Sequence, residues 1–308
     1  MKVIAWNLAH QVKVRPIPAD FVDVILATGA ETVLFNEYVD DTSREPFKAA
    51  MREAGFLHQA VSKTPARHNQ IFAASKHAFE LGDLLPPQFD GSAISNFLHL
   101  KFVDFPFEMV GLRAPAYEKA ADRKAYWAEL GQIMESAKDR PILFAGDINF
   151  DPFVKAKQEG ASRVPFPLAS GYQVPNPRGD WSYLAHSGKG YKIDHVIHTP
   201  GVEVKEVEYL TCIGDRHLAG EKSNAPIFDH AALRFDLGLS SGRTTGGSWN
   251  RSPTRRTWTP PNAFSRRPRF SFRLRSIASR RSARTMDTSS TIERSSSRTT
   301  LGSLSGLD

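Results

Sequence analysis

Short apolar segments rich in β-branched and aromatic residues recur along the first 237 residues, and they constrain the fold most strongly. Their composition and length predict β-strands in "KVIAWN", "TVLFNE", "QIFAASK", "PILFAGD", "YKIDHVIHT", "VEVKEVEYLT" and "HAALRFDL". The segment "SAISNFLHLKFVDFPFEMVGLR" is expected to carry several more. Helical spacing is found in residues 18–30, 42–55 and 117–139. Many strands with few helices between them predict an α/β or α+β fold with layered sheets.

The composition changes sharply after this patterned region. Residues 241–308 contain 14 Arg, no Lys and three acidic residues among many Ser, Thr, Pro and Gly. Such a segment buries too little apolar surface to offset its ordering entropy, so we predict a folded domain over residues 1–238 and a disordered tail over 239–308. The net charge of +7 belongs to the tail, because the remaining residues hold 26 basic and 30 acidic side chains.

Several classes of protein are disfavoured by what the sequence lacks. Cys212 is the only cysteine, which excludes an internal disulfide and a cysteine-based metal cluster and favours a reducing, cytoplasmic location. No apolar run approaches the roughly 18 residues of a membrane span, and the first residues do not resemble a signal peptide. Neither GxxxxGK[ST] nor HExxH occurs, so nucleotide-fuelled transfer and zinc proteolysis have no support.

Polar side chains stand at or near one end of each of five predicted strands. They are Asn7, Glu37, Asp147, Asn149, Asp194, His195, Asp229 and His230. A single strand-terminal Asp is more often a turn or a helix cap than a ligand. Five such positions in one chain predict a site in the loops at one edge of the sheets. The two-residue spacing of Asp147 and Asn149 predicts that both lie on one face of an extended chain.

These residue types suit the hydrolysis of a phosphoester. Glu37, with an amide such as Asn7, offers the hard oxygen ligands that Mg²⁺ or Mn²⁺ prefers. An Asp can orient or deprotonate an attacking water, and an Asn can donate a hydrogen bond to developing charge. A His held by an Asp is fixed in one tautomer, from which it can contact a phosphoryl oxygen or act as acid or base.

The order of five short motifs resembles the endonuclease/exonuclease/phosphatase superfamily, the fold of deoxyribonuclease I and exonuclease III. The motifs are "WN" at 6–7, "FNE" at 35–37, "GDIN" at 146–149, "KID" at 192–194 and "FDH" at 228–230. The segment "HNQIFAASK" is similar to a central strand of the same superfamily. The resemblance spans about residues 1–237 and implies a four-layer α/β/β/α sandwich with its site at one edge of two packed sheets.

The resemblance also implies a role for each of these residues. Asn7 and Glu37 would bind the divalent metal, with Asp229 beside it. Asp147 would orient or activate the nucleophilic water, and Asn149 would support the transition state.

Two further assignments follow from motif position. Asp194 would pair with His230, and Asn69 would face the site from the middle strand. Trp181 and Tyr183, in the segment before Asp194, either pack in the core or contact substrate. In the same segment, Lys189 and Lys192 are candidates for holding a phosphate; of these four we include Trp181 and Lys192 in the candidate site.

Two positions depart from the superfamily's pattern. Many members carry a His in the strand before the long helix, where "EMVGLRAP" places Arg113. An arginine cannot transfer a proton at neutral pH, but it can clamp a phosphate through two parallel hydrogen bonds; the alternative is a surface cation near the helix start. Some nucleases also have an acid where this chain has Ala9, which weighs against abasic-site endonucleases only.

Three functions remain open. The first is a Mg²⁺- or Mn²⁺-dependent nuclease that cleaves DNA or RNA, with the Arg-rich tail as a non-specific aid to binding. The second is a phosphatase or phosphodiesterase of a small or lipid-linked phosphoester, favoured by the mildly acidic body. The third is a catalytically silent protein that binds nucleic acid through its tail, suggested by Arg113.

Overall fold

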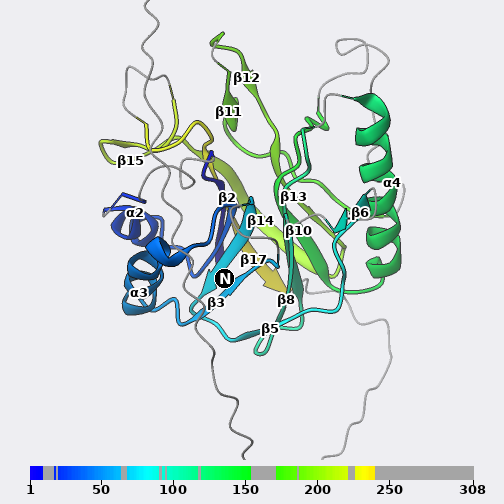
Figure 1. Cartoon of the computed structure of the whole chain (residues 1–308), viewed down its shortest axis with the longest axis horizontal. Helices are drawn as coiled ribbons and strands as arrows, with labels where there is room; N and C mark the ends of the chain where they lie inside the picture. The colour runs from blue at the N-terminus through cyan, green and yellow to red at the C-terminus, as the bar shows by residue number, and fades with distance from the viewer. Residues whose placement is uncertain are drawn as a thin grey trace, which may run out of the picture. The chain divides into compact units, whose positions relative to one another are not determined.

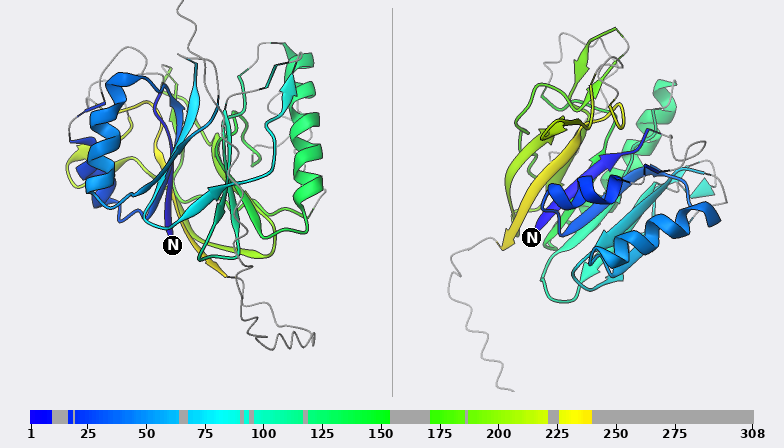
Figure 2. Two further views of the ribbon diagram at one scale, coloured as in Figure 1. Left: turned by 60° about the horizontal axis from the view of Figure 1, so that its bottom comes forward. Right: turned by 90° about the vertical axis from the view of Figure 1, so that its left-hand side faces the viewer.

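Two β-sheets pack face to face between helices in the computed structural model of this chain (Figures 1 and 2). The structure describes residues 1–9, 17–18, 20–63, 68–89, 92–93, 96–116, 119–153, 171–185, 187–220 and 226–239. All of them belong to one compact unit. The order of layers is helices, sheet, sheet, helix, which confirms the predicted four-layer α/β/β/α sandwich.

The first sheet has six strands in the order β14-β17-β1-β2-β4-β3. Their bounds are Lys2–Asn7 for β1, Thr32–Tyr38 for β2, His58–Val61 for β3, Gln70–Ser75 for β4, Val202–Leu210 for β14 and Ala232–Leu239 for β17. β1 and β2 are parallel, whereas β17 runs antiparallel to β1. The carboxyl ends of β1 and β2 therefore lie at the same edge of this sheet.

The second sheet has five strands in the order β13-β10-β9-β8-β5. Their bounds are Phe79–Leu81 for β5, Phe97–Phe102 for β8, Glu108–Leu112 for β9, Ile142–Asp147 for β10 and Asp194–His198 for β13. β9 and β10 are parallel, so their carboxyl ends also share an edge. Three two-stranded pairs complete the described strands: β6 (Gln88–Phe89) with β7 (Ser92–Ala93), β11 (Tyr183–Leu184) with β12 (Gly190–Tyr191), and β15 (Cys212–Ile213) with β16 (Arg216–His217).

Helices cover both outer faces (Figure 2). α2 (Phe21–Ala27) and α3 (Glu45–Glu53), the latter preceded by the 3₁₀ turn η1 (Thr42–Arg44), pack on the six-stranded sheet, and α4 (Ala120–Ala137) packs on the five-stranded sheet. The second residue of α3 is Pro46, whose missing N–H costs nothing in a first turn, and the helix ends two residues before Gly55. Gly55 has a φ of 93°, which suits a helix end better than any residue with a Cβ. None of the described helices is long and apolar enough to cross a membrane.

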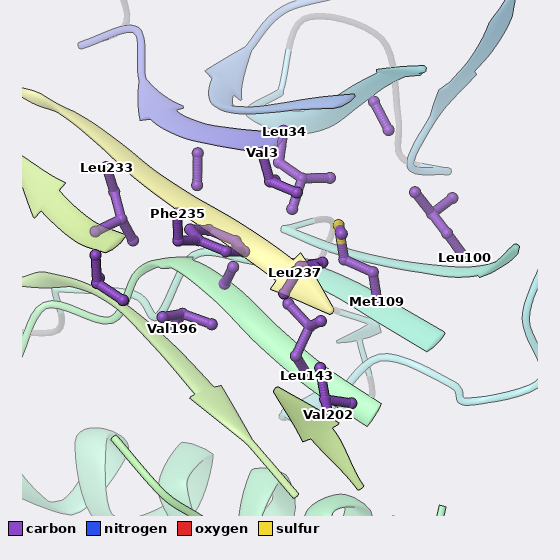
Figure 3. Close-up of a cluster of buried hydrophobic side chains, with 14 of the residues drawn as sticks. Val3, Leu34, Leu100, Met109, Leu143, Val196, Val202, Leu233, Phe235 and Leu237 are labelled. Atoms are coloured by element: carbon purple, nitrogen blue, oxygen red, sulfur yellow. The ribbon is translucent and has the colours of Figure 1, made fainter. Parts of the chain in front are cut away.

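The core between the sheets follows from the two-residue period of the strands. In β1, Val3 and Ala5 face the second sheet, whereas Ile4 and Trp6 face the helices. The inter-sheet core continues across both sheets, and Figure 3 labels Val3, Leu34, Leu100, Met109, Leu143, Val196, Val202, Leu233, Phe235 and Leu237. The same period brings Asn7, two residues after Ala5, onto the inter-sheet face at the end of the strand.

The predicted tail lies almost wholly outside the described residues. Leu239, where we placed its start, is the last residue of β17, and residues 240–308 are not described. The division into a folded domain and a disordered tail therefore stays a prediction.

Gly146 in β10 is expected to tolerate no side chain. A Cβ at this position would lie 2.1 Å from the carbonyl oxygen of Leu112 and 2.7 Å from Nδ2 of Asn36, and the φ of 138° is unfavourable for other residues. We expect Gly146→Ala to lower the free energy of unfolding by about 3 kcal/mol or more. Gly131→Ala is the matched control in α4, where a Cβ meets nothing within 4 Å; it should gain about 0.5–1 kcal/mol. Urea unfolding monitored by circular dichroism measures both, and equal stabilities would contradict the packing described here.

A buried histidine is expected to make the fold acid-sensitive. His198, at the end of β13, is buried, and burial lowers its pKa below 6.5 although backbone contacts oppose the change. The unfolded chain then binds more protons than the folded chain, so stability is lost as the pH falls below about 6.5. We expect His198→Gln to narrow the difference in unfolding free energy between pH 7.5 and pH 5. His217→Gln, at an exposed position, should leave that difference unchanged, and an unchanged difference in both variants would contradict the assignment.

Candidate active site

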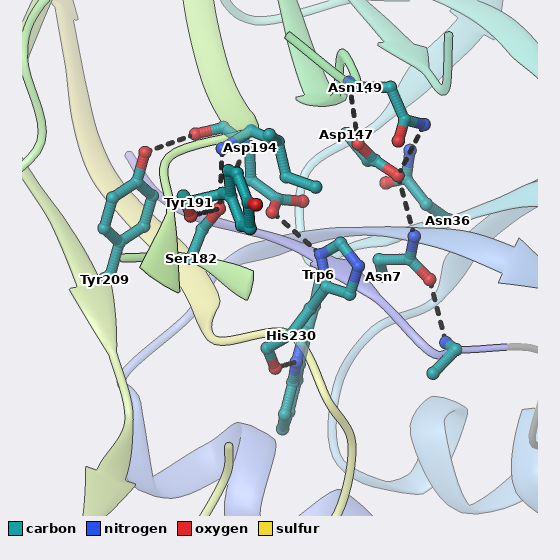
Figure 4. Close-up of polar contacts among 12 residues, drawn as sticks. Trp6, Asn7, Asn36, Asp147, Asn149, Ser182, Tyr191, Asp194, Tyr209 and His230 are labelled. Atoms are coloured by element: carbon teal, nitrogen blue, oxygen red, sulfur yellow. Dashed lines mark hydrogen bonds and ion pairs between the residues drawn. The ribbon is translucent and has the colours of Figure 1, made fainter. Parts of the chain in front are cut away.

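Polar side chains from both sheets meet at one end of the inter-sheet space (Figure 4). Nδ2 of Asn7 donates hydrogen bonds to Oε1 of Glu37 at 3.3 Å and to Oδ2 of Asp147 at 3.0 Å. Asn7 is the last residue of β1 and Glu37 the last but one of β2, both in the first sheet, and Asp147 is the last residue of β10 in the second. The amide of Asn7 therefore ties the two sheets together where their parallel strands end.

Asp147 is an almost fully enclosed acid. It is 1% exposed, and it lies directly opposite Asp194 in the β10–β13 pair. Burial raises the pKa of Asp147 to about 6, and the charge of Asp194 adds to this, while His230 and Arg113 oppose it. Two like charges facing each other across a ladder repel, so this carboxylate is held in an unfavourable environment.

Asn149 donates two hydrogen bonds to Asp147, an arrangement that their two-residue spacing does not predict. Its backbone N–H donates to Oδ1 of Asp147 at 2.9 Å, and its Nδ2 donates to Oδ2 at 3.1 Å. Nδ2 also reaches the carbonyl oxygen of Ala114 at 2.7 Å. The φ of Asn149 is 48°, so the expected extended chain is wrong: a left-handed turn after β10, which an Asn adopts more readily than most residues, brings the two side chains together.

Glu37 reaches the site because its strand is irregular. In β2, Leu34 faces the inter-sheet core and Phe35 faces the helices, so a regular strand would direct residue 37 toward the helices. The pairing with β4 instead shifts register between Phe35 and Tyr38, and Glu37 has a φ of 55°. Such a φ is uncommon for a residue with a long side chain, and here it turns a 5% exposed carboxylate toward Asn7.

Arg113, which follows β9, also enters this group. Its Nε lies 2.6 Å from Oε1 of Glu37 and 3.6 Å from Oδ2 of Asp147, and its side chain is only 17% exposed. The alternative of a surface cation is therefore wrong, because the guanidinium is largely buried among carboxylates.

His230 and Asp194 form the second half of the site. Nδ1 of His230 lies 2.8 Å from Oδ2 of Asp194, and both side chains are buried. Burial lowers the pKa of His230, but the charges of Asp194, Asp147 and Asp229 outweigh it and raise the pKa to about 9. The imidazolium then donates Nδ1–H to Asp194, and its Nε2 has no hydrogen bond to any described residue.

Four residues support this pair, and the sequence assigned none of them such a role. Oγ of Ser182 accepts hydrogen bonds from the backbone N–H groups of residues 193 and 194. The hydroxyl of Tyr209 donates to the carbonyl oxygen of Asp194 at 2.8 Å, and Nε1 of Trp6 donates to that of His230 at 2.7 Å. The ring of Tyr183 lies against the imidazole, with centroids 4.9 Å apart. Trp6, Ser182 and Tyr183 stand in segments that the sequence singled out, whereas nothing in the sequence pointed to Tyr209.

Asn36 is a further residue to which the sequence assigned no role. It is fully buried, and its Nδ2 donates to the carbonyl oxygen of Leu112, which joins β2 to β9 across the sheets. Glu37 directly follows Asn36, and Arg113 directly follows Leu112. The contact therefore fixes the relative position of the two strand ends that carry them.

The remaining predicted residues are not all brought to this group. Asn69 stands one residue before β4, whose Gln70 pairs with Tyr38 beside Glu37. Trp181 packs against Gly190 and the inter-sheet core. Nζ of Lys192 donates to Oδ1 of Asn176 and to the carbonyl oxygen of Pro177. No contact of Trp181 or Lys192 with Asp147 or His230 is found among the described residues.

The carboxylates of this site suit a divalent cation, whereas the amide of Asn7 is not oriented to bind one. Burial raises the pKa of Asp229, and the charge of Glu37 adds to this while His230 opposes it, which places two carboxylates near each other. Such hard oxygen donors are what Mg²⁺ and Mn²⁺ prefer. Asn7, however, presents Nδ2 to Glu37, and its Oδ1 accepts the backbone N–H of Ala9 at 2.8 Å. Here it orients a carboxylate, and direct ligation would require its amide to rotate.

A separate group of candidate ligands lies at the other end of β9. It consists of Asp83, His99 and Glu108. Both ring nitrogens of His99 are already engaged: Nδ1 accepts the backbone N–H of residue 84, and Nε2 lies 2.8 Å from Glu108. Arg140 pairs with both acids. We interpret this group as an ion-pair network that holds β5, β8 and β9 together.

The chain belongs to the Endonuclease/Exonuclease/phosphatase family, whose pattern matches residues 4–225. Members of this superfamily hydrolyse phosphoester bonds as nucleases and phosphatases. The resemblance read from the five motifs is thereby confirmed. A search of curated proteins finds no match.

Solved structures of low sequence identity share the fold. An AP endonuclease from Archaeoglobus fulgidus has a TM-score of 0.58 and 14% identity over 78% of this chain and 100% of its own. A 3'-5' exonuclease from Neisseria meningitidis has a TM-score of 0.56 and 15% identity over 78% and 100%. An endonuclease/exonuclease/phosphatase from Beutenbergia cavernae has a TM-score of 0.55 and 17% identity over 78% and 71%.

Proposed function

We propose that this protein is a divalent-metal-dependent nuclease that cleaves phosphodiester bonds of DNA or RNA by attack of water. The observation that carries the proposal is a buried carboxylate, Asp147, whose two oxygens are each oriented by hydrogen bonds from Asn7 or Asn149. The His230–Asp194 pair stands beside it, close enough for the charges to perturb one another. Solved structures that share the fold include a 3'-phosphatase bound to a DNA hairpin product.

Each side chain has a distinct part in this proposal. Asp147 orients the attacking water, because its position is fixed by donors on both oxygens. Asn149, whose Nδ2 donates to Asp147 and to the carbonyl oxygen of Ala114, would release one of these acceptors and donate to charge that develops on the phosphoryl group. Nε2 of His230 donates to a phosphoryl oxygen, while Asp194 keeps the ring in one orientation.

Glu37 and Asp229 would hold the metal, with Asn7 orienting Glu37 and able to join as a ligand after rotation. Bound Mg²⁺ or Mn²⁺ would polarise a phosphoryl oxygen and offset charge in the transition state. The free Cys212 and the reducing, cytoplasmic location that we propose are compatible with such oxygen-ligand chemistry.

A substrate panel in Mg²⁺ and in excess EDTA tests the proposal. It should contain nicked plasmid, single-stranded DNA, RNA, inositol phosphates and nucleotide monophosphates. We expect cleavage of at least one nucleic acid in Mg²⁺ and none in EDTA, because without a metal the carboxylates of the site would repel the phosphoryl group, and the charge of His230 would not offset theirs. Cleavage that survives EDTA would contradict the metal dependence.

A phosphatase or phosphodiesterase of a small or lipid-linked phosphoester is the second candidate. The mildly acidic body favours it, since a polyanionic strand would be repelled by such a surface. Activity confined to the monoesters of the same panel would select this function over the nuclease. Absence of hydrolysis on every substrate would instead favour the silent nucleic-acid-binding protein.

A further inference from the structure

Arg113 is a cation built into the proposed metal site. The backbone N–H of Arg113 donates to the carbonyl oxygen of Asn96 at 3.0 Å, which anchors this residue to the β8–β9 edge. From there its Nε reaches Oε1 of Glu37 at 2.6 Å. The same oxygen accepts Nδ2 of Asn7 at 3.3 Å, so one carboxylate oxygen is shared between an amide and a guanidinium.

The contact with Glu37 is close but poorly directed. Nε of Arg113 is buried and makes no hydrogen bond to any described residue, because the groups are close without being aligned. The attraction is therefore mainly that of opposite charges in a partly buried place, which is strong at such a distance. A pair held by charge alone can be replaced by another cation without the loss of an aligned hydrogen bond.

The charges around Arg113 explain why a cation is needed there. Glu37 and Asp147 are 5% and 1% exposed, and Asp147 also faces Asp194. Buried carboxylates without a partner are strongly destabilising. A divalent cation bound to Oε1 of Glu37 would neutralise the same charge, so the cation and Nε of Arg113, which lies 2.6 Å from that oxygen, would compete for one carboxylate.

We propose that Arg113 is the resident counter-ion of Glu37, which a divalent metal must displace, so that this residue weakens metal binding while it stabilises the metal-free protein. The inference rests on the proposed function, because it takes Glu37 as a metal ligand. The terminal nitrogens of the guanidinium make no hydrogen bond to the described part of the chain. Displacement from Glu37 therefore costs Arg113 no other side-chain hydrogen bond of that part.

The test compares metal binding by four forms of the full chain: wild type, Arg113→Gln, Arg113→Lys and Arg140→Gln. Arg140 also pairs with two carboxylates, Asp83 and Glu108, but at the other end of β9. Calorimetric titration with Mn²⁺ measures the Kd, and thermal unfolding with and without Mg²⁺ measures the stabilisation by metal. Neither measurement depends on activity.

We expect Arg113→Gln to bind Mn²⁺ about tenfold more tightly than wild type, a usual size for coupling between two sites. Without metal its Tm should fall below that of the wild type, and Mg²⁺ should raise its Tm by more, since stabilisation grows with affinity. Arg140→Gln should lose stability but keep the wild-type Kd. Arg113→Lys keeps a charge at this position, and it should bind Mn²⁺ less tightly than Arg113→Gln.

Equal or weaker Mn²⁺ binding by Arg113→Gln would overturn the inference and leave the metal-dependent function standing. If Arg113→Gln does not fold, Arg113→Ala, which also removes the cation, takes its place: a Mn²⁺ Kd below that of wild type would support the inference, and a Kd at or above it would overturn the inference. Absence of metal binding in every form, together with hydrolysis that persists in EDTA, would overturn the proposed function as well.

Discussion

Asp147→Asn is expected to lower kcat by about 10³-fold or more while leaving the fold intact. The amide has nearly the shape of the carboxylate, so the strand end and its neighbours can stay in place. It can neither carry a negative charge nor accept a proton from water, and it competes poorly for the N–H groups of Asn7 and Asn149. Initial rates on the best substrate of the panel, in saturating Mg²⁺, measure the effect.

The same substitution is expected to stabilise the metal-free protein or leave it unchanged. The folded-state pKa of Asp147 is raised to about 6 from 3.8, so its ionisation opposes folding. Stability is therefore present below the unfolded pKa and is lost as the pH rises through about 6. Asp147→Asn has no charge at this position and therefore does not lose this stability at neutral pH. In EDTA its Tm should equal or exceed that of the wild type.

Asp151→Asn is the matched control for Asp147→Asn. Asp151 follows four residues later, and its Oδ1 accepts the backbone N–H of Phe153 at 2.9 Å in a turn that an Asn also forms. Its activity should stay within about twofold of wild type, because a substitution that keeps the turn usually changes the free energy of folding by no more than about 0.5 kcal/mol. If Asp147→Asn retains more than a tenth of the wild-type kcat, Asp147 does not have the role proposed for it.

The sheet layers and half of the site follow from the alternation of side chains along the strands. Val3, Ala5 and Asn7 share one face of β1, and the same rule carries Asp147 inward at the end of β10. Parallel pairing then brings their strand ends to one edge. These predictions succeed because the pattern that buries the core also orients the polar residue that ends each strand.

Glu37 shows where this reasoning fails. Alternation along β2 would turn it toward the helices, and only a register shift and a left-handed φ bring it to the site. Asn149 likewise depends on a left-handed turn. Both conformations are set by contacts with residues far along the chain, which a local pattern does not contain.

Residues that act through long-range contacts were harder still to predict. Ser182 and Tyr209 hold Asp194 through hydrogen bonds to its backbone, and Asn36 joins two sheets whose packing no motif specifies. The pairs β11–β12 and β15–β16 have strands of two residues, too short to show a period. Arg113 remained ambiguous in the sequence because its partners come from other strands.

His230→Gln and Asp194→Asn are expected to lower kcat by similar factors, each about 10²-fold or more. Gln retains a donor but cannot be held as an imidazolium, and an amide in place of the Asp194 carboxylate would no longer offer a charged acceptor to Nδ1 of His230. The Asp194 carboxylate acts only through His230, by orienting the imidazole and keeping it protonated. The double variant His230→Gln/Asp194→Asn should therefore be no slower than the slower of the two single variants. Residues that work as one unit give such non-additive effects.

Tyr209→Phe tests whether structural support of the His230–Asp194 pair can be weakened without losing the contribution of the pair to catalysis. It removes the hydroxyl that donates to the backbone of Asp194 at 2.8 Å but leaves both side chains of the pair. We expect a loss of about 1 kcal/mol in unfolding free energy, the usual net worth of one hydrogen bond, and a kcat within tenfold of wild type. If the effects of His230→Gln and Asp194→Asn multiply in the double variant, the two residues act independently. The orientation of His230 by Asp194 would then contribute nothing to the chemistry, and the tilted ring contact with Tyr183 would be left to position the imidazole.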